Sequence, residues 1–447
     1  MTTAATPHIL LVNPWIHDFA AYDFWAKPLG LLTLGAILLQ HGARVSYIDC
    51  LDRFHQNAKP VPQKIRHGRG PYLKTPIAKP KGLEDIPRNY CRYGIKQKWF
   101  ETDLKACGKP DLIFVTSLMT YWYPGVFETI RIIKDVFPGV PVVLGGIYAG
   151  LCFDHAVKNA NADRVFNGPG EPDLLDIVDE YTGWSPAPLF DPADIDTYPV
   201  PALHLQKEIA YAPILASRGC PYNCAYCASK TLQPRILRRN PGTVTKEIIH
   251  WQKTFNVKDF AFYDDALLVD DEHFIIPILE QVIQSGIKVR FHTPNALHIR
   301  EITEKNARLM AKAGFHTIRL GLETTAFEHR ERLDRKVTEN DFNKAAGYLL
   351  EAGFKKEQVG AYLLAGLPGQ SVRAVEASIR IVKQTGITPV IAHYTPIPHT
   401  PMWKEAVAVS RYDIESDPVY TNNAIFPCMS KSFSWQTLTR LKNLIQS

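Results

Sequence analysis

Apolar and polar positions along the chain form two series in which short apolar runs alternate with stretches of helical periodicity. In the first series the runs have the length of buried strands, and the stretches between them follow the 3.6-residue period of helices. The expected strands are residues 8–14, 43–50, 111–118, 140–147 and 163–167, and the expected helices are 29–41, 124–137 and 153–162. Parallel strands need crossover helices, so this series predicts an open, doubly wound, Rossmann-like parallel sheet within residues 1–181.

The second series follows a proline-rich stretch, residues 182–210, which has little periodicity and is expected to be a linker. Its expected strands are 211–217, 258–264, 288–293, 316–323, 359–365 and 388–395, and its expected helices are about 243–255, 272–285, 303–313, 339–352 and 371–385. Six such strand–helix units predict a partial (βα)6 barrel over residues 211–404, with functional residues at the carboxyl ends of its strands. Residues 405–447 are expected to form a helical tail.

Composition places the chain among soluble globular proteins. It has 447 residues, of which 46% are hydrophobic and 21% charged, so disordered and fibrous classes are excluded. The longest apolar run near the start, Leu29–Leu39, is too short to cross a bilayer and lacks the features of a signal peptide. We therefore expect no membrane span and a cytoplasmic location.

Positive charge is concentrated in one insertion, residues 53–100. This segment carries twelve Lys and Arg residues against Glu84 and Asp85, whereas the whole chain has a net charge of only +6. Such a proline-rich basic segment predicts a solvated loop. The functional alternatives are a flap that binds an anionic cofactor or substrate phosphate, or a nucleic-acid surface; the second is disfavoured because the segment lacks the aromatic interleaving typical of base-stacking surfaces.

Three of the eight cysteines, Cys220, Cys224 and Cys227, share one short loop after the first expected barrel strand. Their C-x3-C-x2-C spacing lets three thiolates bind three irons of a [4Fe-4S] cluster and leaves the fourth iron without a protein ligand. A zinc site is the alternative, but it would need a fourth ligand nearby, and no Cys or His lies between Cys227 and His250. The scattered cysteines are interpreted as free thiols, with a second cluster as the alternative: Cys50, Cys91, Cys107, Cys152 and Cys428.

The cysteine loop, RGCPYNCAYC at Arg218–Cys227, closely resembles that of the radical S-adenosylmethionine (radical SAM) superfamily. The resemblance implies that the open iron chelates the methionine part of S-adenosylmethionine. An electron from the reduced cluster then splits the sulfonium and gives a 5′-deoxyadenosyl radical. The resemblance also implies an external one-electron reductant such as flavodoxin or ferredoxin.

Further contacts to S-adenosylmethionine are implied by position in the barrel. Tyr226 matches the aromatic residue that the family commonly has before the third cysteine. The second strand ends in Asp264 and Asp265, where the family often has Gly-Gly-Glu, so the contact to the methionine amino group departs from the usual pattern. The ends of strands three, four and five supply the remaining candidates: Asn295, Glu323, Leu367, Pro368 and Gly369. For each position, turn chemistry or a structural polar contact is the alternative.

The sixth expected strand contributes His393 and Tyr394, which are candidates for an acid, a base or a radical relay facing the substrate. A His next to a Tyr is also common as a packed, hydrogen-bonded pair, and that is the alternative interpretation.

A doubly wound domain followed by a radical SAM barrel resembles the cobalamin-binding radical SAM enzymes. The matching segments are VNP, KPLGLLTLGAILLQHGARVSYID, SLMT, LGGIYA and NGPGE, at 12–14, 27–49, 117–120, 144–149 and 167–171. In that group the loops at the carboxyl edge of the sheet hold the corrin. The corresponding candidates are Ser117, Met119, Thr120, Gly145, Gly146, Gly168, Gly170 and Glu171. The D-x-H-x-x-G motif of other cobalamin domains is missing, as it usually is in this group.

The leading hypothesis is a radical SAM enzyme that performs cobalamin-dependent methyl transfer or rearrangement on a small molecule, a lipid precursor or a peptide. In one alternative the barrel works without cobalamin and the sheet domain covers the substrate. In another, less favoured because nucleic acid is an unlikely partner of this surface, the protein binds or modifies RNA.

Overall fold

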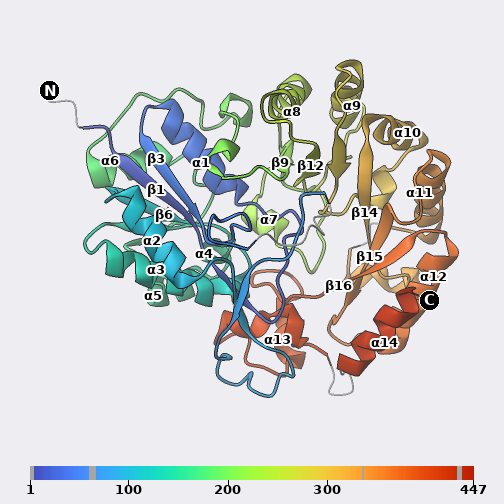
Figure 1. Ribbon diagram of the computed structural model, residues 1–447. Helices are drawn as coiled ribbons and strands as arrows, with labels where there is room; N and C mark the ends of the chain where they lie inside the picture. The colour runs from blue at the N-terminus through green and yellow to red at the C-terminus, as the bar shows by residue number, and fades with distance from the viewer. Residues whose placement is uncertain (1–4, 60–66, 335–336, 430–434, 447) are drawn as a thin grey trace. The chain divides into compact units, whose positions relative to one another are not determined.

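The computed structural model describes residues 5–59, 67–334, 337–429 and 435–446. The chain forms two compact units, residues 1–210 and 211–447 (Figure 1). None of the helices in the described part of the chain combines the length and apolar character that a membrane-spanning segment requires.

The first unit is built on a five-stranded parallel sheet with the strand order β3-β1-β6-β7-β8. Its strands are β1 (His8–Asn13), β3 (Arg44–Asp49), β6 (Leu112–Val115), β7 (Val142–Leu144) and β8 (Arg164–Val165). Its helices are α1 (Leu29–Gln40), α2 (Gln97–Cys107), α3 (Tyr123–Val136), α4 (Ile147–Leu151), α5 (Phe153–Asn159) and α6 (Leu174–Thr182). The predicted doubly wound α/β sheet is confirmed.

Strand β1 shows why both faces of this sheet need helices. Its six residues are all buried, and alternate side chains point to opposite faces. Leu10 and Val12 pack in the core formed with α2 and α3, whereas Ile9 and Leu11 pack in the core formed with α1 and α6. A continuous apolar run is therefore the pattern that a doubly covered parallel strand requires.

The stretch expected to be a linker, residues 182–210, belongs to the first unit. Phe190 is buried in the core shared with α1, and the Ala202 amide donates to the Leu32 carbonyl oxygen at 3.0 Å. The stretch contains two short 3-10 helices, η2 (Ile195–Thr197) and η3 (Leu203–Leu205). Apolar residues between its prolines pack the stretch against α1. Because these residues follow no regular period, the sequence pattern did not predict this packing.

The basic insertion is folded, which corrects the expectation of a solvated loop. Strands β4 (Lys74–Pro76) and β5 (Cys91–Tyr93) join β2 (Ile16–Asp18) in an antiparallel sheet with the order β2-β5-β4. Arg53 is buried and its guanidinium lies 3.1 Å from the Asp23 carboxylate. Buried apolar and aromatic side chains fix the insertion to the unit: Tyr72, Leu83, Ile86, Tyr90 and Tyr93. Residues 60–66 lie outside the described residues.

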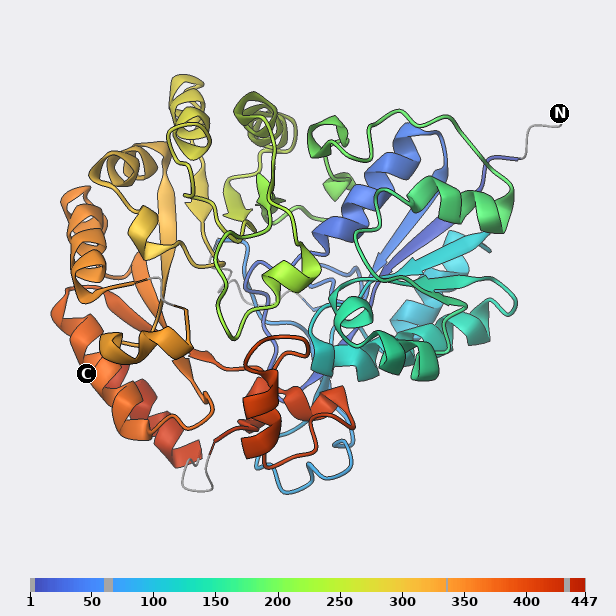
Figure 2. The same ribbon diagram turned by 180° about the vertical axis from the view of Figure 1, so that it is seen from behind.

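The second unit is built on a six-stranded parallel sheet whose strands follow chain order, from β9 at one edge to β16 at the other. Its strands are β9 (Ala212–Ile214), β12 (Asp259–Phe262), β13 (Arg290–His292), β14 (Phe315–Glu323), β15 (Val359–Ala365) and β16 (Thr388–His393). The intervening helices are α8 (Pro241–Phe255), α9 (Ile275–Gln284), α10 (Glu304–Ala313), α11 (Glu339–Glu351) and α12 (Val372–Gln384). Both views show these helices along one side of the curved strand series (Figures 1 and 2). The predicted partial barrel is confirmed.

Short elements complete the second unit. A two-stranded antiparallel pair, β10 (Ser217–Arg218) with β11 (Leu237–Arg238), encloses the cysteine loop and the short helix α7 (Ser229–Leu232). The 3-10 helices are η4 (Ile299–Glu301), η5 (Phe327–Arg332), η6 (Pro418–Thr421) and η7 (Asn423–Ile425). The tail contains α13 (Trp403–Val409) and α14 (Trp435–Gln446), and α14 is tied to α12 by an ion pair between Arg440 and Glu376.

Candidate functional site

The cysteine loop begins at a backbone position that only glycine satisfies. Gly219 has a φ of +83°, and a Cβ there would lie 2.6 Å from the carbonyl oxygen of Arg235, two residues before β11. Cys220, Cys224 and Cys227 follow and form no disulfide; Cys224 is buried and the other two are partly exposed. The hairpin formed by β10 and β11 therefore sets where the three thiols gather.

The donor set fits an iron–sulfur cluster. Burial, together with the neighbouring Cys224 thiol, raises the pKa of Cys220 to about 11, so the apo loop disfavours thiolates. Iron supplies the positive charge that deprotonates such thiols and offsets their mutual repulsion. Three thiols held in this way fit a [4Fe-4S] cluster with one open iron.

Two predicted contacts, Tyr226 and Glu323, meet each other. The Tyr226 hydroxyl donates to Oε1 of Glu323 at 2.8 Å, although the residues are 97 positions apart. Glu323 ends β14 at a register shift and has a φ of +64°, which is strained for a residue other than glycine. Arg330 holds that conformation, because Nη1 donates to the carbonyl oxygens of Leu322 (2.6 Å) and Thr324 (2.9 Å).

The two aspartates that follow β12 have different surroundings. Asp264 is buried and accepts from Ser217 Oγ (2.6 Å) and the Ala216 amide (3.1 Å); burial raises its pKa to about 6. Asp265 accepts at 2.8 Å from Oγ of Ser229, two residues after the third cysteine. Asp264 thus fixes the segment that leads into the loop, whereas Asp265 contacts the short helix that follows the loop.

The ends of β13 and β15 carry the other predicted positions. Asn295 is exposed and donates from Nδ2 to the Tyr263 carbonyl oxygen at 2.7 Å, which links the ends of two neighbouring strands. The turn at Leu367, Pro368 and Gly369 is closed by Gln370, whose side chain accepts from the Gly366 amide (2.9 Å) and donates to the Leu364 carbonyl oxygen (2.8 Å).

His393 and Tyr394 lie in different surroundings. The His393 ring packs on Phe426, with ring centroids 4.8 Å apart. Tyr394 is buried in a cluster with Leu367, Met402 and Cys428, and burial raises the pKa of its hydroxyl. Among the described atoms this hydroxyl has no hydrogen-bond partner. The two side chains do not form the mutually bonded pair that was the alternative interpretation.

Three residues beside the first cysteine were not identified from the sequence. His298 Nε2 lies 3.4 Å from Cys220 Sγ, and the Tyr222 ring packs on the imidazole with a centroid distance of 4.3 Å. The Tyr222 hydroxyl donates to the Glu301 carboxylate. The only available signal was position, because Tyr222 lies between the cysteines and His298 follows the end of the third barrel strand.

In the first unit, a cavity of about 40 Å³ lies at the carboxyl ends of β1 and β6. Its lining residues are Asn13, Pro14, Trp15, Ile16, Ala26, Lys27, Pro28, Leu51, Thr116, Ser117, Leu118, Trp122 and Val126. Leu118 and Ile147 stay exposed at 41% and 36%, which is unusual for large apolar side chains at a sheet edge. A Cβ on Gly145 would meet nothing within 4 Å. This edge therefore combines apolar surface with open space above the backbone.

The other predicted residues at this edge have mixed roles. Ser117 is buried and its Oγ donates to the Gly145 carbonyl oxygen at 2.7 Å, so it ties two loops together. Gly146 has a φ of +95°, and a Cβ there would lie 2.3 Å from the Ser117 carbonyl oxygen. Thr120 and Glu171 are buried, Met119 and Gly170 are partly exposed, and Gly168 is exposed.

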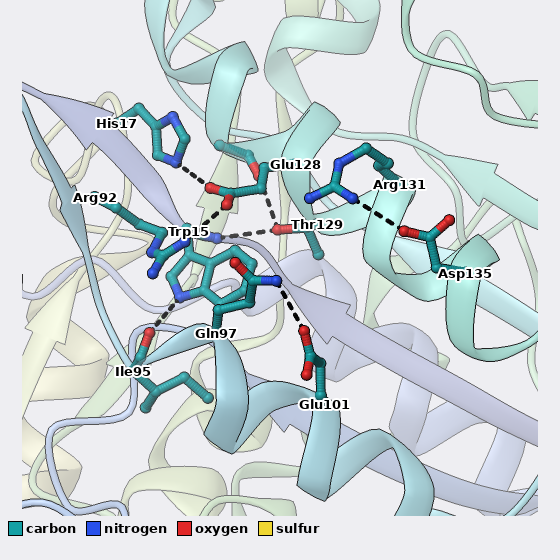
Figure 3. Close-up of polar contacts among 11 residues, drawn as sticks. Trp15, His17, Arg92, Ile95, Gln97, Glu101, Glu128, Thr129, Arg131 and Asp135 are labelled. Carbon is teal, nitrogen blue, oxygen red and sulfur yellow. Dashed lines mark hydrogen bonds and ion pairs between the residues drawn. The ribbon is translucent and has the colours of Figure 1, made fainter. Parts of the chain in front are cut away.

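Figure 3 shows a buried polar network that holds Trp15 in the cavity wall. Trp15 Nε1 donates to the Ile95 carbonyl oxygen at 2.7 Å, and the Arg92 guanidinium lies over its ring. Glu128 on α3 receives both Arg92 (2.7 Å) and His17 (2.8 Å). Burial alone would raise the pKa of Glu128, but the hydrogen bond from His17 and the charge of Arg92 outweigh it and lower the pKa.

Comparisons with known proteins agree with this architecture. Residues 214–382 match the Radical SAM superfamily model. An uncharacterized methyltransferase from Pyrococcus horikoshii is 24% identical over 333 residues, which cover 67% of this chain and 70% of that protein. Cytidylyl-2-hydroxyethylphosphonate methyltransferase from Streptomyces wedmorensis is 20% identical, with 85% and 78% covered.

Among solved structures, the radical S-adenosylmethionine methyltransferase TsrM from Kitasatospora setae, with cobalamin and a [4Fe-4S] cluster bound, superposes with a TM-score of 0.68. The match covers 98% of this chain and 89% of that one, at 15% identity, and so shows a shared fold. Taken with the cysteine loop at the head of a partial barrel, the family match identifies residues 214–382 as a radical SAM domain.

Proposed function

We propose that this protein is a cobalamin-dependent radical SAM methyltransferase. The observation that carries the proposal is the gathering of Cys220, Cys224 and Cys227 on one loop that contacts the carboxyl end of β14 through Tyr226 and Glu323. Carboxyl ends of parallel barrel strands are where enzymes of this architecture place their chemistry. The names of the methyltransferase relatives and the cobalamin-bound structural neighbour support the finer assignment.

In this proposal the three thiolates hold the [4Fe-4S] cluster, with S-adenosylmethionine at the open iron. When bound, these two cofactors supply the one-electron chemistry that cleaves the sulfonium. The chain's own residues position them. Glu323 fixes Tyr226 within the loop, and Asp265 and Glu323 present carboxylates that can accept hydrogen bonds from an ammonium group.

Cobalamin is assigned to the carboxyl edge of the first unit. Exposed Leu118 and Ile147 and the open space above Gly145 suit a large, flat ligand with apolar faces. Trp15, held by Ile95 and Arg92, gives that edge a rigid aromatic wall.

One observation favours a second candidate, a radical SAM enzyme without cobalamin whose sheet unit covers the substrate. The cavity at this edge has a volume of only about 40 Å³, and Trp15 and Trp122 occupy part of its wall. Retention of a corrin distinguishes the two candidates.

The partners belong to the same proposal. Radical SAM chemistry needs an external electron donor, and we assign this role to a flavodoxin or ferredoxin. The substrate is assigned to small metabolites, lipid precursors or peptides. All eight cysteines lie in the described residues and none forms a disulfide, as is usual in a reducing compartment, which supports a cytoplasmic location.

The test is anaerobic purification and reconstitution. We expect about four irons per chain, release of 5′-deoxyadenosine from S-adenosylmethionine under reduction, and corrin absorbance that survives desalting after incubation with hydroxocobalamin. Absence of iron and of 5′-deoxyadenosine would overturn the radical SAM assignment. Full cluster content without retained corrin would overturn cobalamin dependence and select the second candidate.

A further inference from the structure

The His298 imidazole lies against the first cysteine of the loop. Its Nε2 is 3.4 Å from Cys220 Sγ, within hydrogen-bonding range for sulfur, and only 8% of the residue is exposed. A cysteine that binds iron is a thiolate, which can only accept. The nitrogen facing it must then carry the proton, so His298 is the donor of this contact.

The position of His298 is fixed from three sides. The preceding residue, Leu297, bonds to β14 through its amide to Arg319 (2.7 Å) and its carbonyl oxygen to Gly321 (3.0 Å). The following turn is closed by the Glu301 amide, which donates to the His298 carbonyl oxygen at 3.1 Å. Tyr222 packs on the ring and bonds to Glu301. A buried imidazole held in this way loses little entropy when it donates to the thiolate.

A donor at this place has an electronic consequence. Reduction adds an electron to the cluster and increases the negative charge on its sulfur ligands, so a hydrogen bond to a ligand sulfur stabilises the reduced form more than the oxidised form. Removing the donor should therefore lower the reduction potential of the cluster.

We propose that His298 is a positioning residue that donates a hydrogen bond to the Cys220 thiolate and raises the reduction potential of the cluster. This inference rests on the proposed function, because it needs the cluster at Cys220, Cys224 and Cys227. The Tyr222–Glu301 bond orients the imidazole for this role.

The test compares His298→Phe, which keeps a ring against Tyr222 but has no donor, with His298→Gln, which keeps an N–H. Potentiometric titration of the reconstituted full-length protein, without S-adenosylmethionine, measures the midpoint potential. We expect His298→Phe to lower the ratio of reduced to oxidised cluster about tenfold at a fixed solution potential, a shift of about 59 mV for one electron. His298→Gln should recover part of the shift. An exchangeable proton coupled to the reduced cluster should disappear from the electron–nuclear double-resonance spectrum of His298→Phe.

Ile299→Val is the matched control, because it perturbs packing at the next buried residue without touching a donor. An unchanged potential in His298→Phe, or an equal shift in Ile299→Val, would overturn the inference. Should His298→Phe fail to hold the cluster, His298→Leu replaces it in the same comparison. Iron content keeps this outcome separate from the proposed function: wild-type protein that holds no cluster overturns the function, whereas a full cluster with unchanged potential overturns only the role of His298.

Discussion

The two units place their candidate sites at the same topological position, the carboxyl edge of a parallel sheet, but build them differently. Around the cysteine loop, side chains at or beyond strand ends bond to the loop or to the helix after it: Glu323 to Tyr226, His298 to Cys220 and Asp265 to Ser229. At the edge of the first unit, close backbone approach at Gly146 and an aromatic wall at Trp15 define the surface. The two arrangements suit different ligands: individual polar atoms suit a small charged cofactor, whereas an apolar surface with open space suits a large flat one.

The largest effect is expected from removing one of the three cysteines of the loop. Cys224→Ala removes one of the three thiolates, so the cluster should be lost and release of 5′-deoxyadenosine should fall more than about 1,000-fold, because cluster binding requires all three. Iron content and product release measure this. Cys107→Ala, at a partly exposed thiol of the first unit, is the control and should change neither. Comparable loss in both variants would contradict the assignment of the loop.

At the carboxyl edge of the first sheet, Gly146→Ala should destabilise the fold. The new Cβ would lie 2.3 Å from the Ser117 carbonyl oxygen at a φ of +95°, so we expect a loss of about 3 kcal/mol of unfolding free energy. Gly145→Ala is the matched control, because a Cβ there meets nothing within 4 Å. Denaturant unfolding followed by circular dichroism measures the difference. Equal stability of the two variants would argue against close backbone approach at this edge.

A smaller loss of stability is expected from breaking the ion pairs of Glu128 beside Trp15. Glu128→Gln removes the carboxylate shared by Arg92 and His17 and should cost about 2 kcal/mol, less than for a fully buried pair. Because the folded-state pKa of Glu128 is lowered, its contribution is present above the ordinary glutamate range of about pH 4 and is lost as the pH falls through the folded value. The difference from wild type should therefore shrink in acid.

The control for Glu128→Gln is Asp135→Asn on the same helix. Asp135 pairs with Arg131 in solvent, also drawn in Figure 3, and its loss should cost less than about 0.5 kcal/mol. Thermal and denaturant unfolding at pH 7 and at pH 3.5 provide the comparison. A stability gap for Glu128→Gln that persists undiminished at the lower pH would contradict the ion-pair explanation.

The smallest effect is expected at the hydrogen bond between the cysteine loop and the end of β14. Tyr226→Phe removes the hydrogen bond to Glu323 but keeps the ring, so we expect roughly a fivefold decrease in 5′-deoxyadenosine release, about 1 kcal/mol, with iron content unchanged. Tyr198→Phe, which removes an exposed bond to the Pro192 carbonyl oxygen, should leave the rate as it is. Loss of iron from Tyr226→Phe would instead assign the bond to cluster retention.

Sequence predicted the fold well where the signal is periodic and local. The expected strand 359–365 coincides with β15, and 316–323 differs from β14 by one residue. Apolar runs between helices specify such strands because both of their faces are covered. The insertion was misjudged because its order depends on distant partners: Arg92 bonds to a carboxylate 36 residues away, and Arg53 pairs with Asp23.

The candidate site likewise contains residues that the sequence predicted and residues that it did not. The cysteines were predictable because cluster ligation imposes a fixed local spacing. His298 and Glu323 contact the loop from 78 and 97 residues away along the chain. Glu323 was identified by its place at a strand end, but its bond to Tyr226 was not. His298 was missed because it lies beyond its strand, in a segment without a motif.

The folded insertion limits how the chain can be shortened. Ile95 and Arg92 are both supplied by residues 53–100, and both hold Trp15. Excising this segment as if it were a dispensable surface excursion would leave the indole nitrogen without its acceptor and Glu128 without its arginine. A minimal version of the first unit, for grafting onto another barrel or for isolated expression, must therefore retain the insertion or replace Trp15 and Glu128 together.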